Sequence, residues 1–414
     1  MTFDPDRMGV CLFAKVCRRI ACFVGLAMAF VVAGCASRQQ TLANDAYVWQ
    51  RQWTPSLARS ISDSGNEVRA WRVLAAEMDG RGQWRTFSPA WPVLAASGKS
   101  VIAVVRVEGA LQQWDEATLV EHVRELLSRW RLQGIHFAGV EIDHDCATLR
   151  LPAYTHFLAS LRPLLTSGER LSITALPTWL ESPELDALLA QADEAVLQVH
   201  AVQSPRAGLF QPERARAWLS EFARHTGKPW RVALPAYGTR VSWDEQGNVI
   251  AIESERPTLV DSTESRELFA EPASMQRFVS ALEADVPQGL AGIVWFRLPT
   301  EGDERAWSMA SWHAVLARTP LTSSVTVRTV TSDDPSRLDV QVVNAGTSDV
   351  ALPALVSIGT ACEAADGING YALQRTPQGL YLQRTRVGLL RAGRQLAIGW
   401  LRCSRSPVTV RIDT

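Results

Sequence analysis

The chain has 414 residues, of which 47% are hydrophobic and 21% are charged, and its formal net charge is −1. This composition is that of a globular protein, and the length allows about two or three domains. A near-neutral chain lacks the concentrated positive charge that binding to phosphate backbones requires, so nucleic acid is not an expected partner.

The first 35 residues have the pattern of an export signal. Basic residues precede an apolar run over residues 20–33, which is too short to span a bilayer comfortably. The run leads into "VAGC", which ends at Cys35 and resembles the lipobox of bacterial lipoproteins, whose cysteine is acylated and becomes the mature N-terminus. The resemblance implies a signal peptide over residues 1–34 and lipidation of Cys35. A plain cleaved signal or an N-terminal anchor helix is the alternative.

An acylated Cys35 would make the membrane a partner through the lipid anchor alone, with residues 35–45 as a tether. Two or more acyl chains hold a protein stably at a bilayer, whereas one chain does not. Ala36 follows the cysteine in place of an acidic residue. By resemblance to lipoproteins of Gram-negative bacteria, this implies a cell-envelope location at the periplasmic face of the outer membrane.

Residues 46–318 alternate short, apolar, β-rich runs with amphipathic helical stretches, the pattern of parallel strands joined by crossover helices. The clearest helical stretch follows Asp115, a good N-cap residue, and stops near Gly134. Eight strands, each followed by a helix, in about 270 residues predict an α/β fold, a (β/α)8 TIM barrel. The expected strands lie at residues 46–50, 69–78, 100–109, 137–143, 171–177, 195–201, 230–238 and 290–299, with further helices at 154–165, 213–225 and 303–318.

Two β-rich additions to the barrel are expected. After the seventh strand, polar and apolar residues alternate on both sides of Gln246, Gly247 and Asn248, which predicts a β-hairpin in that loop. Over residues 319–414 the helical signal disappears, and short strands separated by turn residues predict a small C-terminal antiparallel β-sandwich.

Three cysteines besides Cys35 remain once the signal is removed. Cys362 and Cys403 lie in the same C-terminal region, and an oxidising envelope compartment predicts a disulfide between them. Cys146 is expected to be a small buried hydrophobic residue rather than a nucleophile, because no His and Asn arrangement is evident to activate it.

The most unusual stretch is "GVEIDHD", residues 139–145, which carries three acids at alternate positions. Strand side chains alternate between faces, so Glu141, Asp143 and Asp145 should point the same way. In a barrel the apolar residues between them contact the helices, so the acids should lie inside and rise toward the C-terminal mouth, where strand ends carry the chemistry. Carboxylates this close cannot all stay ionised cheaply, so at least one should have the raised pKa that a general acid needs.

Two other interpretations of the acids remain open. They could lie on a solvated strand edge or be bonded to barrel arginines such as Arg106. They could also form a metal site with His144 or His200, although no HxH or HExxH spacing supports one. We therefore expect no metal and no cofactor.

The stretch "FAGVEIDHD", residues 137–145, resembles the fourth strand of family 18 glycoside hydrolases, the chitinase group, whose motif is DxxDxDxE. The resemblance continues in order through "YTHFLASLRPLL", "LSITALP", "LPAYGTRVSW" and "GIVWFRLP", and so covers roughly residues 46–318. The chain is also similar to an uncharacterised family of bacterial lipoproteins, a domain of unknown function, with this barrel.

The family 18 resemblance implies roles for the acids. Asp145 would protonate the glycosidic oxygen, Asp143 would orient the acetamido group that the substrate itself supplies as nucleophile, and Glu141 would tune their charge. The sequence departs from the motif, because Ala138 replaces its first Asp, Glu141 its second, and the shorter Asp145 its final Glu. These departures favour a non-catalytic, glycan-binding or scaffold lipoprotein as the alternative function.

A sugar site also needs flat apolar faces with hydrogen-bonding edges. Six ring side chains at or after strand ends are the candidates for substrate contact, and packing within the barrel is the alternative role for each. They are Trp49, Trp179, His200, Tyr237, Trp243 and Trp295.

The sequence thus predicts a lipid-anchored, monomeric envelope protein whose barrel hydrolyses or binds a glycan, a class that includes oligosaccharides with N-acetylated sugars. A third interpretation is that the C-terminal sandwich binds a partner and that the barrel merely presents it.

Overall fold

The computed structural model describes residues 41–111, 114–202, 205–253, 264–303, 305–332, 334, 336–359, 362–403 and 408–413. The expected signal peptide and the lipidation site Cys35 lie outside the described residues, and the expected tether lies mostly outside them. Residues from Leu42 onward form one compact unit. No helix in the described part of the chain combines the length and the apolar character needed to cross a membrane.

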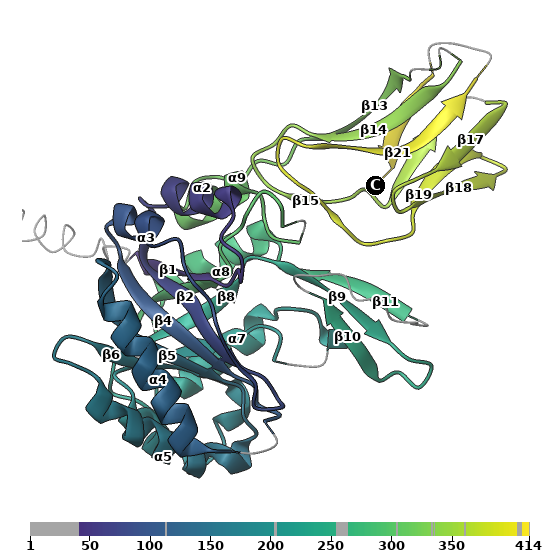
Figure 1. The fold of residues 1–414 in the computed structure, drawn as a ribbon. Coiled ribbons are helices and arrows are strands. Elements are labelled where there is room, and N and C mark those ends of the chain that lie inside the picture. The colour runs from purple at the N-terminus through teal and green to yellow at the C-terminus, as the bar shows by residue number, and fades with distance from the viewer. Residues whose placement is uncertain are drawn as a thin grey trace, which may run out of the picture. The chain divides into compact units, whose positions relative to one another are not determined.

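Eight parallel strands close into a barrel, which confirms the predicted fold class (Figure 1). Their order is β1-β12-β8-β7-β6-β5-β4-β2, and pairing of β1 with β2 closes the ring. A short strand β3 (Trp84–Thr86) extends β2 as an antiparallel hairpin. The barrel strands are β1 (Ala43–Val48), β2 (Val68–Met78), β4 (Ser100–Val107), β5 (His136–His144), β6 (Arg170–Ala175), β7 (Glu194–Gln198), β8 (Trp230–Pro235) and β12 (Leu290–Phe296).

A helix follows each barrel strand. In α4 the residues at helical spacing are the buried ones, and the Asp115 carboxylate accepts a hydrogen bond from the Thr118 N–H at 3.1 Å, which confirms the predicted N-cap. The helix ends at Arg131, three residues before Gly134. The helices are α2 (Pro55–Asp63), α3 (Trp91–Ser97), α4 (Glu116–Arg131), α5 (Leu151–Leu161), α6 (Leu185–Gln191), α7 (Pro212–Phe222), α8 (Pro272–Ala284) and α9 (Met309–Leu316).

The loop after β8 carries an antiparallel sheet of its own, with the order β10-β9-β11. The predicted hairpin is confirmed as β9 (Gly238–Trp243) and β10 (Val249–Glu253). A third strand, β11 (Glu264–Phe269), was not predicted and pairs with the other side of β9. Most side chains of β11 are exposed, and several are charged. The segment therefore lacks the apolar alternation from which a strand is predicted.

The C-terminal region consists of antiparallel strands with a core of their own (Figure 1). One sheet has the order β13-β14-β21-β17, the other β18-β19-β16-β22, and β15 pairs with β20. A disulfide joins Cys362 and Cys403, as the sequence predicts. The strands are β13 (Val325–Thr331), β14 (Leu338–Asn344), β15 (Val350–Ala351), β16 (Leu355–Ile358), β17 (Ala364–Gly367), β18 (Tyr371–Thr376), β19 (Gly379–Arg384), β20 (Leu389–Leu390), β21 (Gln395–Arg402) and β22 (Val410–Asp413).

Candidate functional site

Strand β5 supplies the acids, and its alternation is as predicted. Val140 and Ile142 are fully buried in the main core, whereas Glu141 and Asp143 alternate with them along the strand. The strand ends at His144, so Asp145 is the first residue of the loop that follows. The three acids therefore lie at three levels, from the barrel interior to its C-terminal mouth.

Glu141 lies deepest and is fully buried. Its carboxylate forms an ion pair with Arg72 and accepts hydrogen bonds from the Tyr47 hydroxyl at 2.6 Å and the Ser172 hydroxyl at 2.8 Å. Burial raises the pKa of Glu141, and Arg72 opposes that rise. Glu141 therefore lies inside the barrel, and its carboxylate belongs to the charged interior below the mouth.

Arg72 is the centre of a buried charge network that the sequence did not reveal. Its guanidinium also pairs with Asp45, at 3.2 Å, and with Glu194. Arg231 pairs with Glu194 at 2.9 Å and with Asp45 at 3.4 Å. Each of these four charged residues lies two positions before an apolar residue of the barrel's inner cluster, and that spacing was the available signal. The apolar residues are Tyr47, Leu74, Val196 and Ala233.

Asp143 lies one level higher and is only 7% exposed. The Thr174 hydroxyl donates a hydrogen bond of 2.7 Å to its carboxylate. Burial and the neighbouring Asp145 carboxylate raise the pKa of Asp143 to about 7, against the opposing effects of Arg106 and Thr174. Asp143 thus changes protonation state near neutral pH, which is the property expected of one member of an acid pair.

Asp145 is exposed at the mouth, and Gly109 fixes the path of its backbone. A Cβ atom at Gly109 would overlap the carbonyl group of Asp145, so the loop after β4 and the loop after β5 can meet only with glycine there. The Arg106 guanidinium interacts with both Asp143 and Asp145 and lies 5.9 Å from the centre of the Trp49 ring. Arg106 is therefore a third charged group of the site.

Three of the predicted ring residues meet at the mouth, where they form a cluster with Tyr47 and Phe296. They are Trp49, Tyr237 and His200. Phe296 is the centre of this cluster, with ring centroids 5.1 Å from Trp49, 5.3 Å from Tyr237 and 5.5 Å from His200. The Tyr47 ring lies 5.8 Å from that of Phe296 and lies above Glu141, to which its hydroxyl donates. The cluster covers the charged interior of the barrel.

His200 is 2% exposed, and neither of its ring nitrogens has a hydrogen-bond partner among the described residues. Burial lowers its pKa to about 3, so the imidazole is neutral. A buried, unpartnered polar ring costs free energy, and a bound polar group would recover it.

The other three predicted ring residues are buried and are not part of this aromatic cluster. Trp179 is fully buried and donates its indole N–H to the Cys146 carbonyl at 3.0 Å. Trp243 is 2% exposed on β9, with the Arg206 guanidinium 4.9 Å from its ring centre. Both therefore pack within the protein, which is the alternative role that the sequence left open.

Trp295 is also fully buried, and it lies on the outer face of the barrel wall. Its indole N–H donates to Asn44, and its ring packs against Trp307 and Trp312. The prediction that Trp295 faces the mouth is wrong because adjacent residues of a strand face opposite sides, and Phe296 is the inward one.

The remaining candidates near the acids point away from the mouth. The His144 ring hydrogen-bonds the Val107 carbonyl at 2.9 Å, and burial lowers its pKa to about 4. Burial raises the pKa of the Cys146 thiol to about 12, which keeps it protonated and unreactive. No group of three or more His, Cys, Asp or Glu side chains within the described ranges is arranged to hold a metal ion.

Residues 97–301 match the model of a family described as a domain of unknown function (DUF3142). Residues 327–404 match a second model, described as a domain of unknown function (DUF8456). The first match covers most of the barrel, and the second covers most of the C-terminal strands. No curated protein matches the chain.

Solved structures share the barrel at low sequence identity. The spore cortex-lytic enzyme SleL of Bacillus megaterium QM B1551 has a TM-score of 0.50 and 13% identity, over 69% of this chain and 76% of that chain. A chitinase from Chromobacterium violaceum has a TM-score of 0.48 and 14% identity, over 67% of this chain and 98% of that chain. At this identity the similarity to SleL establishes a common fold.

Proposed function

We propose that the DUF3142 barrel hydrolyses a glycan that contains N-acetylated sugars, with Asp143 and Asp145 as its acid pair. One observation carries the proposal: the buried Asp143 carboxyl, whose pKa is about 7, lies beside the Asp145 carboxyl, whose pKa is also raised by desolvation, at the C-terminal mouth of the barrel. Titratable groups with perturbed pKa values at such a mouth are the usual location of chemistry in this fold.

The pair suits a reaction in which the substrate supplies its own nucleophile. Asp145 donates a proton to the glycosidic oxygen as the bond from that oxygen to the anomeric carbon breaks. The acetamido oxygen of the substrate forms a new bond to that carbon, and Asp143 orients the acetamido group. Water then attacks the anomeric carbon as the bond to the acetamido oxygen breaks, and its proton returns to the Asp145 carboxylate, so no nucleophile from the protein is needed.

The resemblance of residues 137–145 to the family 18 motif supports this assignment. SleL, which shares the fold, is a spore cortex-lytic enzyme, and we take this as support for a hydrolytic function. Asp145 is one methylene shorter than the glutamate of the motif, so the substrate must approach closer to β5 than in that family. A displacement of about 1 Å in a proton donor changes rates by on the order of a hundredfold.

Release of reducing ends from N-acetylated oligosaccharides and from peptidoglycan strands tests the proposal. Asp145→Asn should abolish release and keep binding, and Asp143→Asn should reduce release strongly. Asp244→Asn, in the exposed turn between β9 and β10, is the matched control and should leave the rate unchanged. Release that persists in Asp145→Asn at the wild-type rate would remove Asp145 from the mechanism.

A non-catalytic glycan-binding protein is the second candidate, and the closed aromatic cluster favours it. Trp49 is 4% exposed, Tyr237 5% and His200 2%, and all three rings pack against Phe296. This candidate predicts saturable binding of oligosaccharides without any release of reducing ends over long incubation. Turnover by the wild-type protein that is lost in Asp145→Asn would exclude it.

We also propose that acylation of Cys35 anchors the protein to the periplasmic face of the outer membrane, as a monomer. The support is the "VAGC" stretch at the end of the apolar run. Metabolic labelling with palmitate should mark the wild-type protein and leave Cys35→Ser unlabelled, and fractionation should release that variant from the membrane. The molar mass of the detergent-solubilised protein, measured by light scattering, tests whether it is a monomer.

A further inference from the structure

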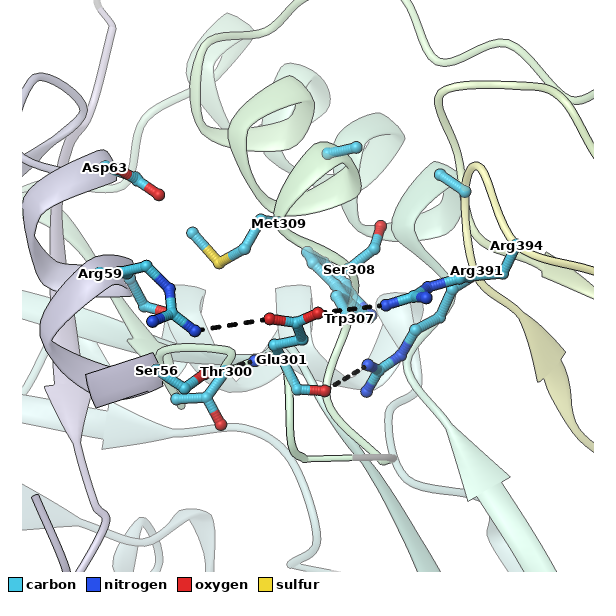
Figure 2. Close-up of a pocket in the computed structure, with 13 residues that line it drawn as sticks. Ser56, Arg59, Asp63, Thr300, Glu301, Trp307, Ser308, Met309, Arg391 and Arg394 are labelled. Atoms are coloured by element: carbon cyan, nitrogen blue, oxygen red, sulfur yellow. Dashed lines mark hydrogen bonds and ion pairs between the residues drawn. The ribbon is translucent and has the colours of Figure 1, made fainter. Parts of the chain in front are cut away.

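A pocket of about 280 Å³ that is not lined by the acid pair carries a concentration of arginines (Figure 2). Helix α2 forms one wall, the start of α9 forms the floor, and the turn between β20 and β21 forms the other wall. Arg59 comes from α2, whereas Arg391 and Arg394 come from the turn. Three guanidinium groups from distant parts of the sequence therefore line one small cavity.

The carboxylate of Glu301 lies between these arginines (Figure 2). It pairs with Arg59 at 3.6 Å and with Arg394 at 3.4 Å. Both pairs are single, long contacts between side chains that are 63% to 66% exposed. Ion pairs of this kind contribute little to stability, so a better anion could displace Glu301 with little loss.

Arg391 is held differently from the other two arginines. Its guanidinium donates to the carbonyl oxygens of Glu301, at 3.3 Å, of Ala306, at 3.0 Å, and of Asp303. These bonds fix the position of a positive charge without neutralising it, because carbonyl oxygens carry no net charge. Arg391 is therefore a preorganised cation at the edge of the pocket.

The N-terminus of α9 does not supply the anion site. Asp349 already accepts hydrogen bonds from the Ser308 N–H at 2.7 Å and from the Ser308 hydroxyl at 2.6 Å. The positive charge available to a ligand comes from the arginines, three against the two carboxylates Asp63 and Glu301. Ser56, whose hydroxyl accepts from the Glu301 N–H at 3.1 Å, and Thr300 add polar groups to the rim.

We propose that this pocket binds an anionic group, the carboxylate or phosphate of a monosaccharide-sized ligand, and that Glu301 occupies the same position in the free protein. The planar guanidinium group presents paired N–H donors and a positive charge, which match the oxygens of both a carboxylate and a phosphate. The pocket volume falls at the small end of ligand sites, which limits the ligand to about one sugar ring with its anionic substituent. The proposal does not require the acid pair on β5 to turn over a substrate.

The test is calorimetric titration of the full-length, detergent-solubilised protein at low ionic strength with two probes, inorganic phosphate and glucuronate. Arg59→Gln and Arg394→Gln should each weaken binding of the preferred probe about fivefold, the loss of one exposed charge contact. Glu301→Gln should strengthen binding by a similar factor, because it removes the competing carboxylate. Arg124→Gln, which changes another exposed arginine, on α4, is the control and should leave binding unchanged.

The arginine variants should weaken binding and Glu301→Gln should strengthen it, and these opposite effects distinguish a specific site from general attraction of anions. If neither probe binds the wild-type protein or Glu301→Gln, the proposal is wrong. It is also wrong if Arg124→Gln weakens binding as much as Arg394→Gln, or if Glu301→Gln weakens binding. Preference for phosphate over glucuronate, or the reverse, identifies which anionic group the arginines select.

Discussion

The hydroxyl of Thr174, on β6, donates a hydrogen bond of 2.7 Å to the buried carboxylate of Asp143, on β5. This bond favours the ionised carboxylate, so it lowers a pKa that burial and Asp145 raise to about 7. Thr174→Val should therefore raise the pKa of Asp143 further, as followed by carboxyl carbon shifts in an NMR titration. Thr155→Val, whose hydroxyl bonds only a carbonyl within α5, is the control. An unchanged or lower pKa in Thr174→Val would contradict the assignment.

Asp143 should also make stability depend on pH. Its pKa rises from 3.8 to about 7 on folding, so the folded protein keeps a proton that the unfolded chain releases. Stability linked to this group is full below about pH 4 and is lost as the pH rises to 7. Asp143→Asn removes that loss, so it should gain stability relative to the wild type between pH 4 and pH 8, by up to a few kcal/mol. Denaturant unfolding of both proteins at pH 4 and pH 8 measures the gain. If the unfolding free energies of the wild type and Asp143→Asn change by the same amount between these pH values, the prediction is wrong.

Gly109 should tolerate no side chain, because a Cβ atom there would overlap the backbone of Asp145. Gly109→Ala should lower the free energy of unfolding by about 1 to 3 kcal/mol and displace the loop that carries Asp145. Gly227→Ala is the matched control, since a Cβ atom at Gly227 has no neighbour within 4 Å. Equal stability of the two variants in urea would show that the loops have room to separate.

Removing the Arg72 guanidinium, the centre of the charge network in the barrel, should destabilise the protein. Arg72→Met leaves Asp45, Glu141 and Glu194 buried with fewer positive partners, which should cost about 3 to 5 kcal/mol of unfolding free energy. Arg124→Met, which breaks an exposed pair with Glu121 on α4, should change little. Guanidinium titrations at pH 7 compare the two variants with the wild type, and a mild effect of Arg72→Met would argue against a buried network.

The same network predicts loss of stability in acid. Burial alone would raise the pKa of Glu194, but Arg72 and Arg231 lower it to about 2, below its ordinary value of 4.5. The stabilisation is therefore full above about pH 4.5 and is lost as the pH falls toward 2. Glu194→Gln should flatten that part of the stability curve measured by thermal unfolding. A wild-type curve that is already flat between pH 4.5 and 2 would contradict the pairing.

Much of the fold could be predicted from the sequence because its signals are local. Alternation of apolar runs with amphipathic helices specified the eight-stranded barrel, and the alternation within "GVEIDHD" specified that Glu141 and Asp143 share a face. Asp115 marked the start of α4, and the hairpin of β9 and β10 followed from its turn residues. Each inference depends on residues a few positions apart, where backbone geometry alone sets the relation.

The composition of the mouth was decided by tertiary structure. Alternation says which residues share a face but leaves open which face points inward, and a shift of one residue reverses the answer. At β12 the inward residue is Phe296 and not Trp295. Phe296 therefore packs on Trp49 inside the mouth, whereas Trp295 packs on Trp307 outside the barrel wall.

Depth along the barrel axis also depends on how the strands are staggered, which no single strand encodes. The sequence by itself determined that acids enter the barrel from β5. Only the packing of the other strands decided that Glu141 meets Arg72 in the interior, while Asp143 and Asp145 reach the mouth beside Thr174 and Arg106.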